Sequence, residues 1–369
     1  MNIGVIGAGA ISDIYLKNMS TRFPGLRVTS VSARHIENAR KKADLYGIRA
    51  VTVEEMLADP DTEMVVILTP VDTHAGLIRD ALNAGKHVYC EKTIAETASE
   101  AFALLDLAKE KGRYLGCAPD TFLGSSLQTA RKLIDSGKIG TVHSFSVSVN
   151  RNNDFLTALF PFLRLPGAGA LRDYLVYFVT ALVSLLGPVD TVAAFCETPY
   201  PSRVGKFPQF SNFGQETPTP NESIVSAIVR MKNGITGTIH ENNESVIGEQ
   251  CLFHLYGTEG ILRLGNPNNF GDTITCYPAD PRTAPEEIAP DLPFGENSRG
   301  VGPAEMASAI LHGEEARAGA GLAAHVLEVL EAMEKSSATG TFVAVTSQTE
   351  RPLPFSEEDY LSLAPGDPV

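Results

Sequence analysis

Short apolar runs alternate with segments of helical periodicity over the first 118 residues. The apolar runs lie at residues 3–6, 27–34, 64–69, 87–91 and 114–117. The segments that space their apolar side chains as a helix does lie at residues 11–19, 37–46, 74–84 and 99–111. Strands that are apolar along their whole length and alternate with helices indicate a parallel sheet with helices on both faces. The pattern predicts an α/β fold in which residues 1–118 form a Rossmann-type doubly wound sheet.

After Pro119 the pattern changes to strands joined by turns. Helical periodicity returns at residues 127–136, 174–186 and 321–337. Strand-like runs lie at residues 142–149, 189–196, 224–231, 236–241, 252–256 and 261–264. Short connections between several of these runs favour antiparallel neighbours. We therefore predict a second, α+β domain over residues 119–369 with a mainly antiparallel open sheet, a loop or arm at 197–221 and an irregular segment at 265–302.

Two glycines follow the first apolar run and precede the first helix. Gly7 and Gly9 stand where a tight turn has to close and where the backbone can approach a pyrophosphate at the positive end of a helix. Ser12 occupies the third position of this fingerprint, and serine is small enough for helix and strand to pack closely. The context predicts a dinucleotide site that includes Gly7, Gly9, Ala10 and Ile11. The alternative is a plain strand-turn-helix unit without a ligand.

The end of the second apolar run is where such sheets distinguish nicotinamide cofactors. An Asp or Glu at this place bonds the ribose 2′-hydroxyl of NAD, whereas an arginine attracts the 2′-phosphate of NADP. This chain has Ser32, Ala33 and Arg34 there. The sequence therefore favours NADP over NAD. In the alternative, Arg34 is a solvated surface residue and NAD binds without a strong ribose contact.

A charged pair, Glu91 and Lys92, stands at the carboxyl end of the run that begins at His87. Ligands of open parallel sheets lie beyond this edge. A lysine there can donate a hydrogen bond to a substrate hydroxyl or carbonyl oxygen and assist proton transfer. Lys92 is thus a candidate catalytic residue, unless the two side chains form an ordinary surface ion pair.

The composition limits the classes of partner. The chain of 369 residues has a formal net charge of −14 and no basic run, which argues against nucleic acid as a partner. No apolar run reaches the roughly 20 residues that span a bilayer, and no signal peptide is recognisable, so we expect a cytoplasmic protein without a membrane partner. The five cysteines are widely spaced, and no cluster has metal-ligand spacing. We expect neither a disulfide framework nor a metal site.

Several motifs together resemble the Gfo/Idh/MocA family of oxidoreductases. They are Gly7-Ala8-Gly9, Thr69-Pro70 with His74, and Ala84-Gly85-Lys86-His87-Val88 leading into Glu91-Lys92. The resemblance implies that Lys92 polarises the reacting oxygen. It also implies that the ribose and nicotinamide pocket is lined by Thr69, Pro70, His74 and Glu91. Thr93 stands where the family usually has a proline, which often forms a cis peptide bond that aims the lysine.

In the second domain, residues 167–177 resemble the family's segment Gly-Gly-Gly-x-x-x-Asp-x-x-x-His, with Tyr177 in place of the histidine. Asp173 and Tyr177 are four residues apart and would share one face of a helix. The resemblance implies that Tyr177 exchanges the substrate proton and that Asp173 orients the sugar or the tyrosine. Without the resemblance, the apolar surroundings of Tyr177 would favour a buried core aromatic.

Part of the chain resembles a subset of the family that acts as glycoside 3-dehydrogenases. The segments concerned are residues 117–124, 128–131, 296–300 and 350–352. The implied reaction is reversible hydride transfer between nicotinamide and a secondary alcohol or ketone of a sugar, cyclitol or glycoside. Residues 150–165, where the substrate loop would lie, depart from the subset and leave the specificity open. Family members commonly pair through their C-terminal sheets, which implies a homodimer or homotetramer.

Three other functions fit the same residues. The first is a glycoside-cleaving enzyme that uses NAD transiently, by oxidation followed by elimination. The second is a non-catalytic sugar or cofactor sensor, against which the retained Lys92 and Tyr177 argue. The third is a dehydrogenase of non-sugar substrates such as aromatic diols. A net change in nicotinamide absorbance during turnover would separate a dehydrogenase from the glycoside-cleaving enzyme.

Overall fold

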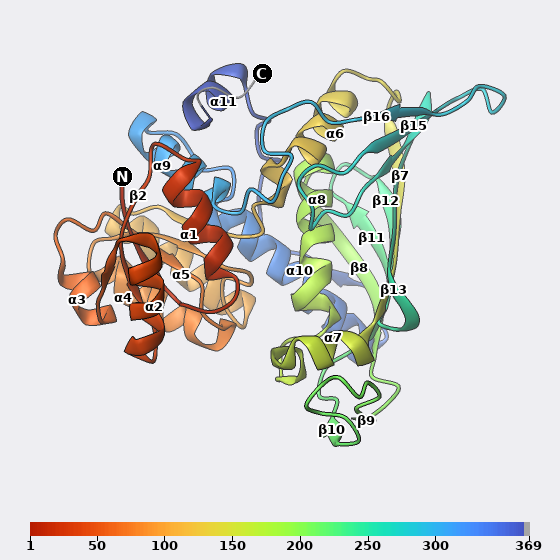
Figure 1. Cartoon of the computed structure of the whole chain (residues 1–369). Coiled ribbons are helices and arrows are strands. Elements are labelled where there is room, and N and C mark those ends of the chain that lie inside the picture. Colours follow the sequence, from red (N-terminus) through yellow and green to blue (C-terminus); the bar gives the residue numbers. More distant parts are fainter. Residues whose placement is uncertain (365–369) are drawn as a thin grey trace.

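The structure, a computed structural model, describes residues 1–364. In it the chain folds into two lobes (Figure 1). The first lobe contains a six-stranded sheet in the order β3-β2-β1-β4-β5-β6, and every neighbouring pair is parallel. Its strands are β1 (Asn2–Ile6), β2 (Arg27–Ser32), β3 (Arg49–Ala50), β4 (Met64–Ile67), β5 (His87–Cys90) and β6 (Leu115–Cys117). Every residue of β4 is buried, as expected of a central strand covered on both faces. The predicted doubly wound sheet is confirmed.

The helices of this lobe begin and end at the residues that their local chemistry favours. They are α1 (Ser12–Thr21), α2 (Ile36–Tyr46), α3 (Val53–Ala58), α4 (His74–Asn83) and α5 (Ala98–Lys111). At the start of α5, the side chain of Thr97 accepts a hydrogen bond from the amide of Glu100. Gly47 and Gly112 end α2 and α5 in the left-handed conformation, with φ of 66° and 62°. The short helix α3 was not predicted, because six residues carry too little periodicity.

The second lobe is built on a nine-stranded sheet in the order β16-β15-β14-β13-β7-β12-β11-β8-β17. Its strands are β7 (Val142–Asn152), β8 (Val189–Glu197), β11 (Ile224–Met231), β12 (Thr236–Asn242), β13 (Glu244–Gly257), β14 (Gly260–Leu264), β15 (Ile274–Pro278), β16 (Glu286–Ile288) and β17 (Val343–Ala344). The pair β7–β12 is parallel and the other pairs are antiparallel. The sheet is therefore mainly antiparallel, as predicted, although the short connections did not reveal the parallel pair.

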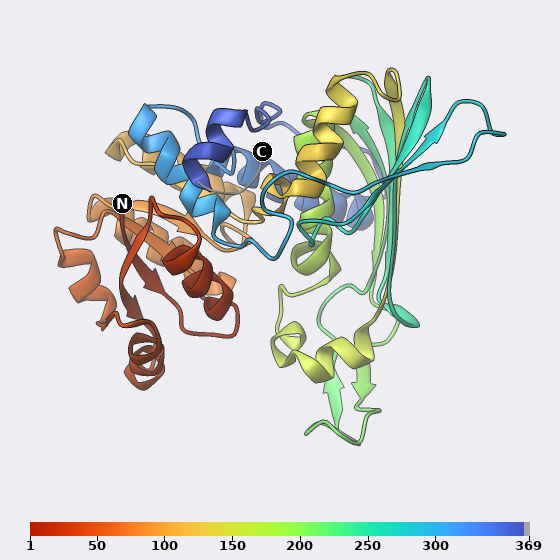
Figure 2. The ribbon, with the colours of Figure 1, turned by 45° about the horizontal axis from the view of Figure 1, so that its top comes forward.

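Helices cover only one face of the nine-stranded sheet (Figure 2). They are α6 (Ser125–Asp135), α8 (Val176–Leu186) and α10 (Ala320–Thr339). Every residue of α8 is buried, which agrees with the predicted buried helix. A π-helical turn, Leu171–Leu175, leads into α8 and brings its start to the boundary between the lobes.

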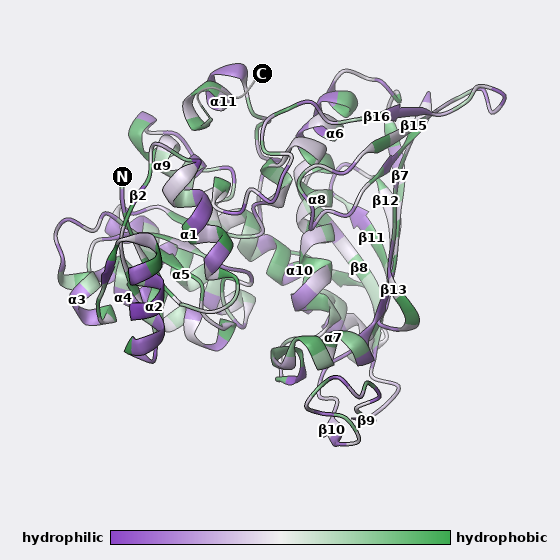
Figure 3. Ribbon diagram, viewed as in Figure 1, coloured by the Kyte–Doolittle hydropathy of each residue, from purple (hydrophilic) through white to green (hydrophobic). Residues whose placement is uncertain are grey.

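A projecting arm extends from the end of the second sheet. It consists of a two-stranded ribbon, β9 (Ser202–Val204) and β10 (Glu216–Pro218), and so fits the arm predicted at residues 197–221. The helix α7 (Asn153–Leu159) lies beside it and is largely hydrophobic (Figure 3). The segment at 265–302 was predicted to be irregular, but it contains β15 and β16 and enters α9 (Val301–His312).

The last part of the chain contacts both lobes. Helix α9 packs against β6, and α10 packs against α5 of the first lobe and β8 of the second. The amide of Cys117 donates a hydrogen bond of 2.9 Å to the carbonyl oxygen of Ala318, which covers the edge of the parallel sheet. The domain division at residue 118 stays a prediction, and residues 365–369 of the predicted second domain lie outside the described residues.

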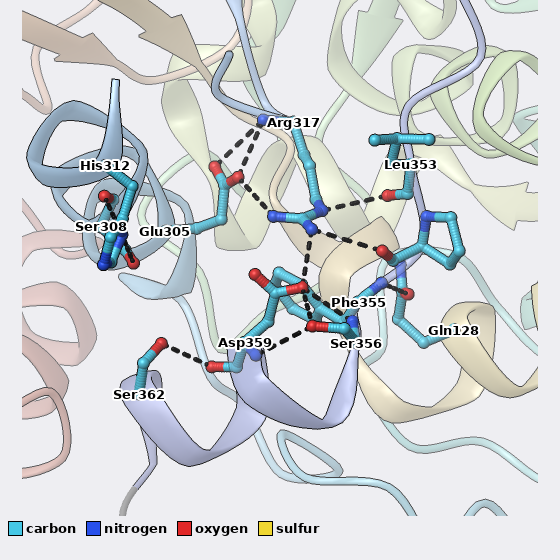
Figure 4. Close-up of polar contacts among 11 residues, drawn as sticks. Gln128, Glu305, Ser308, His312, Arg317, Leu353, Phe355, Ser356, Asp359 and Ser362 are labelled. Carbon is cyan, nitrogen blue, oxygen red and sulfur yellow. Dashed lines mark hydrogen bonds and ion pairs between the residues drawn. The ribbon is translucent and has the colours of Figure 1, made fainter. Parts of the chain in front are cut away.

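A buried ion-pair network fastens the terminal helix α11 (Glu357–Leu363) to α9 (Figure 4). Glu305 is almost completely buried and accepts hydrogen bonds from the backbone amide and Nη1 of Arg317. Arg317 also donates from Nη2 to Asp359, at 2.7 Å, and from Nε to the carbonyl oxygen of Leu353, at 3.1 Å. The positive charge of the Arg317 guanidinium thus compensates the buried negative charge of Glu305.

Arg317→Ala should lower the free energy of unfolding by about 3 kcal/mol, because it leaves the charge of Glu305 buried without its partner. Urea denaturation followed by circular dichroism measures the change. The matched control is Arg282→Ala, which removes an ion pair with Asp280 whose arginine side chain is 88% exposed, and it should change stability by less than about 0.5 kcal/mol. Equal effects of the two substitutions would contradict the structural role of Arg317.

Candidate active site

The turn after β1 leaves room for a ligand at the start of α1. Gly7 has a φ of 120°, and a Cβ placed on it would lie 2.6 Å from the carbonyl oxygen of Leu68. A Cβ placed on Gly9 would meet no described atom within 4 Å, so this residue faces open space. Ala10 and Ile11 are exposed beside it.

Ser12 anchors the same turn from inside. Its hydroxyl donates a hydrogen bond of 2.6 Å to the carbonyl oxygen of Gly9, and the whole residue is buried. A small side chain at the third position of the fingerprint therefore allows the close packing that the sequence predicted. The turn presents backbone and a helix N-terminus to open space, which fits the pyrophosphate of a dinucleotide.

Arg34 lies beyond the carboxyl end of β2 and is exposed. Within residues 1–364 it forms no ion pair, and neither Ser32 nor Ala33 offers a carboxylate. The backbone carbonyl of Ser32 accepts a hydrogen bond from Gly7, at 2.8 Å, so the end of β2 is adjacent to the glycine turn. Arg34 is placed where the adenosine end of a dinucleotide would lie.

Thr69, Pro70 and His74 follow β4, the strand next to β1. The ring of His74 is completely buried between two backbone carbonyls, with Nε2 2.8 Å from the oxygen of Thr69 and Nδ1 2.6 Å from the oxygen of Thr93. Since both ring nitrogens contact the protein, His74 holds the loops after β4 and β5 together. Thr69 and Pro70 are the members of this group that lie nearer the surface.

Glu91 and Lys92 leave the end of β5, as predicted. Glu91 accepts a hydrogen bond of 2.7 Å from the hydroxyl of Tyr15 and one of 3.0 Å from the amide of Lys92. The peptide bond between Lys92 and Thr93 is cis. Tyr15 comes from α1, so the glycine turn and the end of β5 are tied together by a contact that no motif indicated.

The structure brings Lys92, Asp173 and Tyr177 together across the boundary between the lobes. The Nζ atom of Lys92 donates to the backbone oxygen of Asp173, at 2.7 Å, and to its Oδ1, at 3.0 Å. The same Nζ lies 5.4 Å from the centre of the Tyr177 ring. Burial lowers the pKa of Lys92, but Asp173 and Tyr177 outweigh it and hold the pKa above its ordinary value. Lys92 is therefore positively charged at neutral pH.

Asp173 has a second cationic neighbour. Burial raises its pKa, but Lys92 and Arg151 lower it further, and the net pKa lies below the ordinary value. The Nη1 atom of Arg151 lies 3.5 Å from Oδ2 of Asp173, and its guanidinium stacks 3.7 Å from the centre of the Tyr174 ring. Arg151 comes from β7, within the segment where the sequence departs from the resembled subset.

A third cation approaches Tyr177 from the loop before α9. Burial lowers the pKa of Arg299, but Tyr177, Tyr15 and Asp120 raise it, and the net pKa lies above the ordinary value. Asp120 accepts hydrogen bonds from the amides of Gly300 and Gly302, at 3.0 and 3.1 Å. Burial nevertheless raises the pKa of Asp120 to about 6. In the sequence, residues 296–300 carry only a family resemblance, and no local periodicity points to Arg299.

A pocket that is partly open to solvent lies beside Asp173 in the second lobe. Its walls come from α7, the 3-10 turn Pro161–Arg164, the arm and the entry to α8. Asp173 therefore faces Lys92 on one side and this pocket on the other.

These features define a two-lobed protein with a dinucleotide turn in one lobe and a polar pocket at the entry to the other. The sequence comparison agrees with this class. A family described as "Oxidoreductase family, NAD-binding Rossmann fold" matches residues 1–118, and the "GFO/IDH/MocA C-terminal domain" matches residues 127–263. The chain belongs to the Gfo/Idh/MocA family of NAD-binding oxidoreductases.

Relatives of the chain include named sugar and cyclitol dehydrogenases. Levoglucosan dehydrogenase of Pseudarthrobacter phenanthrenivorans is 28% identical over 71% of this chain and 73% of the relative. Inositol 2-dehydrogenase of Gluconacetobacter diazotrophicus is 31% identical over 38% of this chain and 43% of the relative. An uncharacterized oxidoreductase of Schizosaccharomyces pombe is 30% identical over 53% of this chain. The chain matches 54% of the length of this last relative.

Solved structures share the fold of most of the chain. Levoglucosan dehydrogenase in complex with NADH and L-sorbose superposes with a TM-score of 0.81 at 23% identity, covering 94% of this chain and 99% of that one. An NAD binding oxidoreductase from Klebsiella pneumoniae superposes with a TM-score of 0.82 at 20% identity, with the same coverage. Both superpositions extend over the two lobes.

Neither a metal cluster nor a membrane span is found in the part of the chain that the structure describes. No group of three or more His, Cys, Asp or Glu side chains there could hold a metal ion. No helix in residues 1–364 is long and apolar enough to cross a membrane.

Glu241 of β12 lies behind the site as a buried carboxyl group. It is 0% exposed, and neither carboxylate oxygen has a hydrogen-bond partner within residues 1–364. Burial raises the pKa of Glu241 to about 8, although the positive charge of nearby Arg151 lowers it. In the folded protein Glu241 therefore carries a proton at neutral pH, whereas in the unfolded chain it ionises near pH 4.5.

Glu241→Gln should stabilise the protein increasingly as the pH rises from about 4.5 to about 8. In this window the unfolded wild-type chain releases the proton of Glu241 while the folded protein keeps it, so ionisation favours unfolding. Urea midpoints measured at several pH values follow the effect. Glu287→Gln, on the exposed strand β16, is the control and should give the wild-type pH profile. A shift of the midpoint that is the same at every pH would contradict this ionisation.

Proposed function

We propose that the protein is an NAD(P)-dependent oxidoreductase that transfers a hydride between nicotinamide and a secondary alcohol or ketone of a sugar, cyclitol or glycoside. The observation that carries the proposal is the meeting of Lys92 with Asp173 and Tyr177 beyond the strand edge where a Rossmann sheet binds its ligand. The named sugar and cyclitol dehydrogenases among the relatives support the substrate class.

The residues of the first lobe would hold the cofactor. The turn that includes Gly7, Gly9, Ala10 and Ile11 would take the pyrophosphate, because its backbone leaves the helix N-terminus open. Thr69, Pro70 and Glu91 would line the ribose and nicotinamide end. His74 would act indirectly, by fixing the loops that carry Thr69 and Thr93. The bound nicotinamide supplies the acceptor or donor for the hydride.

Three side chains would act on the substrate. Lys92 would donate a hydrogen bond to the reacting oxygen and stabilise negative charge on it during the reaction. In the direction of oxidation, the carbinol carbon would give its hydride to the oxidised nicotinamide, and the hydroxyl proton would pass to a deprotonated Tyr177; in reduction the Tyr177 hydroxyl would return the proton to the oxygen. Asp173 would fix the position of Lys92 through the ion pair and accept a hydrogen bond from a neighbouring sugar hydroxyl.

Lys92→Met should abolish turnover and leave cofactor binding nearly unchanged, because the lysine acts on the substrate oxygen and the backbone turn holds the cofactor. Tyr177→Phe should lower kcat by roughly 10²-fold, since the ring remains but the proton donor is lost. A panel of sugars, cyclitols and glycosides, followed by nicotinamide absorbance, measures turnover, and fluorescence titration with NADH measures binding. Loss of NADH binding in Lys92→Met would assign Lys92 a structural role.

We propose NADP as the preferred cofactor, with NAD as the alternative. The support is the exposed Arg34 at the end of β2 and the lack of a carboxylate at residues 32–34. Arg34→Ala should weaken NADPH binding by roughly tenfold and leave NADH binding nearly unchanged, because a guanidinium pairs with a 2′-phosphate. Titration of both reduced cofactors into wild type and variant tests this preference. An equal effect on the two cofactors would exclude it.

We propose a homodimer or homotetramer formed through the face of the nine-stranded sheet that the helices leave uncovered. Phe195, Ile228 and Leu252 are exposed on this face by 66%, 56% and 40%. Ile228→Glu should dissociate the oligomer, because it introduces a charge into an apolar contact. Light scattering measures the mass, and Leu311→Glu, at an exposed site on α9, is the control. A monomeric wild-type protein would disprove the proposal.

The cytoplasmic location stays a prediction.

A further inference from the structure

The pocket beside Asp173 has an unusual lining for a site that would bind only a neutral sugar. Three arginines reach it from three separate segments, namely Arg151 of β7, Arg164 of the 3-10 turn and Arg203 of β9. The chain as a whole carries a formal net charge of −14, so a group of guanidinium ions in one pocket stands out against its surroundings.

The charge of Arg203 is fully compensated. Its Nη1 donates to Asp154, at 2.8 Å, and its Nη2 donates to Glu244. Lys206 also donates to Asp154, at 2.6 Å, so these four groups form a neutral network of two cations and two anions. The charge of Arg203 is therefore balanced by the protein, although its Nε, like that of Arg164, has no hydrogen-bond partner among the described residues.

Arg164 has no such compensation. Within residues 1–364 no carboxylate lies within ion-pair distance of it, and its Nη2 donates to the backbone oxygen of Thr157. Its Nε is buried without a hydrogen-bond partner in the same range. A guanidinium held in a pocket by one backbone contact retains its charge and several free donors.

Arg151 is also under-compensated at the inner end of the pocket. It is 9% exposed, and its Nε has no hydrogen-bond partner among the described residues. Its carboxylate neighbour, Asp173, is shared with Lys92 and bonds the lysine more closely, at 3.0 Å against 3.5 Å. The other nearby carboxyl group, Glu241, carries a proton at neutral pH and adds no negative charge.

Two further polar side chains, those of Asn243 and Glu222, line the pocket. Asn243 is 6% exposed, and its Oδ1 has no partner among the described residues. Glu222 is the remaining carboxylate of the pocket, and its Oε1 accepts a hydrogen bond of 2.9 Å from the amide of Leu171 at the start of the π turn. Lys92, Arg151 and Arg164 thus face two carboxylates, Asp173 and Glu222. Lys92 lies outside the pocket lining, so these five groups together carry an excess of one positive charge, whereas the four that line the pocket balance.

We propose that this pocket binds an acidic substituent of the substrate, a carboxylate or a phosphate ester, through Arg164 and Arg151. The inference rests on the proposed function, because Asp173 joins the pocket to Lys92. The substrate would place its reacting carbinol at Lys92 and its acidic group in the pocket. Guanidinium groups suit both anions, since their planar donors match two oxygens at once.

Isothermal titration calorimetry on the NADH-loaded protein tests the proposal with matched ligands. The probes are glucose with glucuronate, gluconate and glucose 6-phosphate, and galactose with galacturonate. At least one acid should bind about tenfold or more tightly than its neutral parent, because a charge-assisted hydrogen bond is lost in the parent. A comparison of the affinities for the carboxylates with the affinity for the phosphate ester identifies the kind of acid.

Three variants locate the binding group. Arg164→Gln should reduce the preference for the acid to about threefold or less, whereas Arg164→Lys, which keeps the charge but not the planar pair of donors, should retain part of it. Arg282→Gln, at an arginine 88% exposed on the surface, should leave the preference unchanged. Melting temperatures of all variants show whether each remains folded.

Two results would overturn the inference: no acid that binds more tightly than its parent, or a preference that Arg164→Gln leaves intact. Failure of the proposed function gives a different pattern. In that case an acid binds with the expected dependence on Arg164, but no sugar or acid changes the nicotinamide absorbance. If neutral sugars are turned over but acids are neither turned over nor bound more tightly, the proposed function is supported and the acidic subsite is excluded.

Discussion

The ion pair between Lys92 and Asp173 is the contact on which the arrangement of the candidate site depends. It joins the end of β5 in one lobe to the π turn before α8 in the other, over a sequence separation of 81 residues. Both groups are largely removed from water, and either charge alone would be costly to bury. Because each compensates the other, the edge of the parallel sheet and the start of α8 are held in register, and Tyr177 lies one helical turn further on.

The two lobes divide the chemistry between them. The first lobe offers backbone, in the form of an open turn at Gly9 and a helix N-terminus, which suits the repeated phosphates of a dinucleotide. The second lobe offers side chains of both charges around a pocket, which suits a polar substrate of defined shape. The last segment of the chain contacts both lobes, and Arg317 anchors it through the buried Glu305. In the proposed function, cofactor and substrate would therefore be held by separate lobes that this segment joins.

The sequence predicted long, strongly patterned elements well and short ones poorly. The strand at 224–231 was predicted with the bounds that β11 has, since a mostly apolar run rich in β-branched residues ends there at an Asn-Gly turn signal. Helix α9 was missed because Gly302 and Pro303 look like a break, yet a proline is tolerated in the first turn, where its missing amide has no helical partner. Helix α7 was missed because seven residues, of which four are apolar, do not separate a helix from a strand. Helix α9 was therefore hidden by a Gly-Pro pair, and helix α7 by its short length.

The sequence alone determined those parts of the candidate site that are formed by consecutive residues of the chain. Gly7 and Gly9 between a strand and a helix, and Glu91 and Lys92 at a strand end, are consecutive residues whose positions follow from strand direction. Only the tertiary structure decided that Tyr15 bonds Glu91, that Arg151 and Arg299 approach Asp173 and Tyr177, and that Arg164 faces the same pocket. Periodicity fixes the face on which a side chain lies, but not the distant residue that packs against that face.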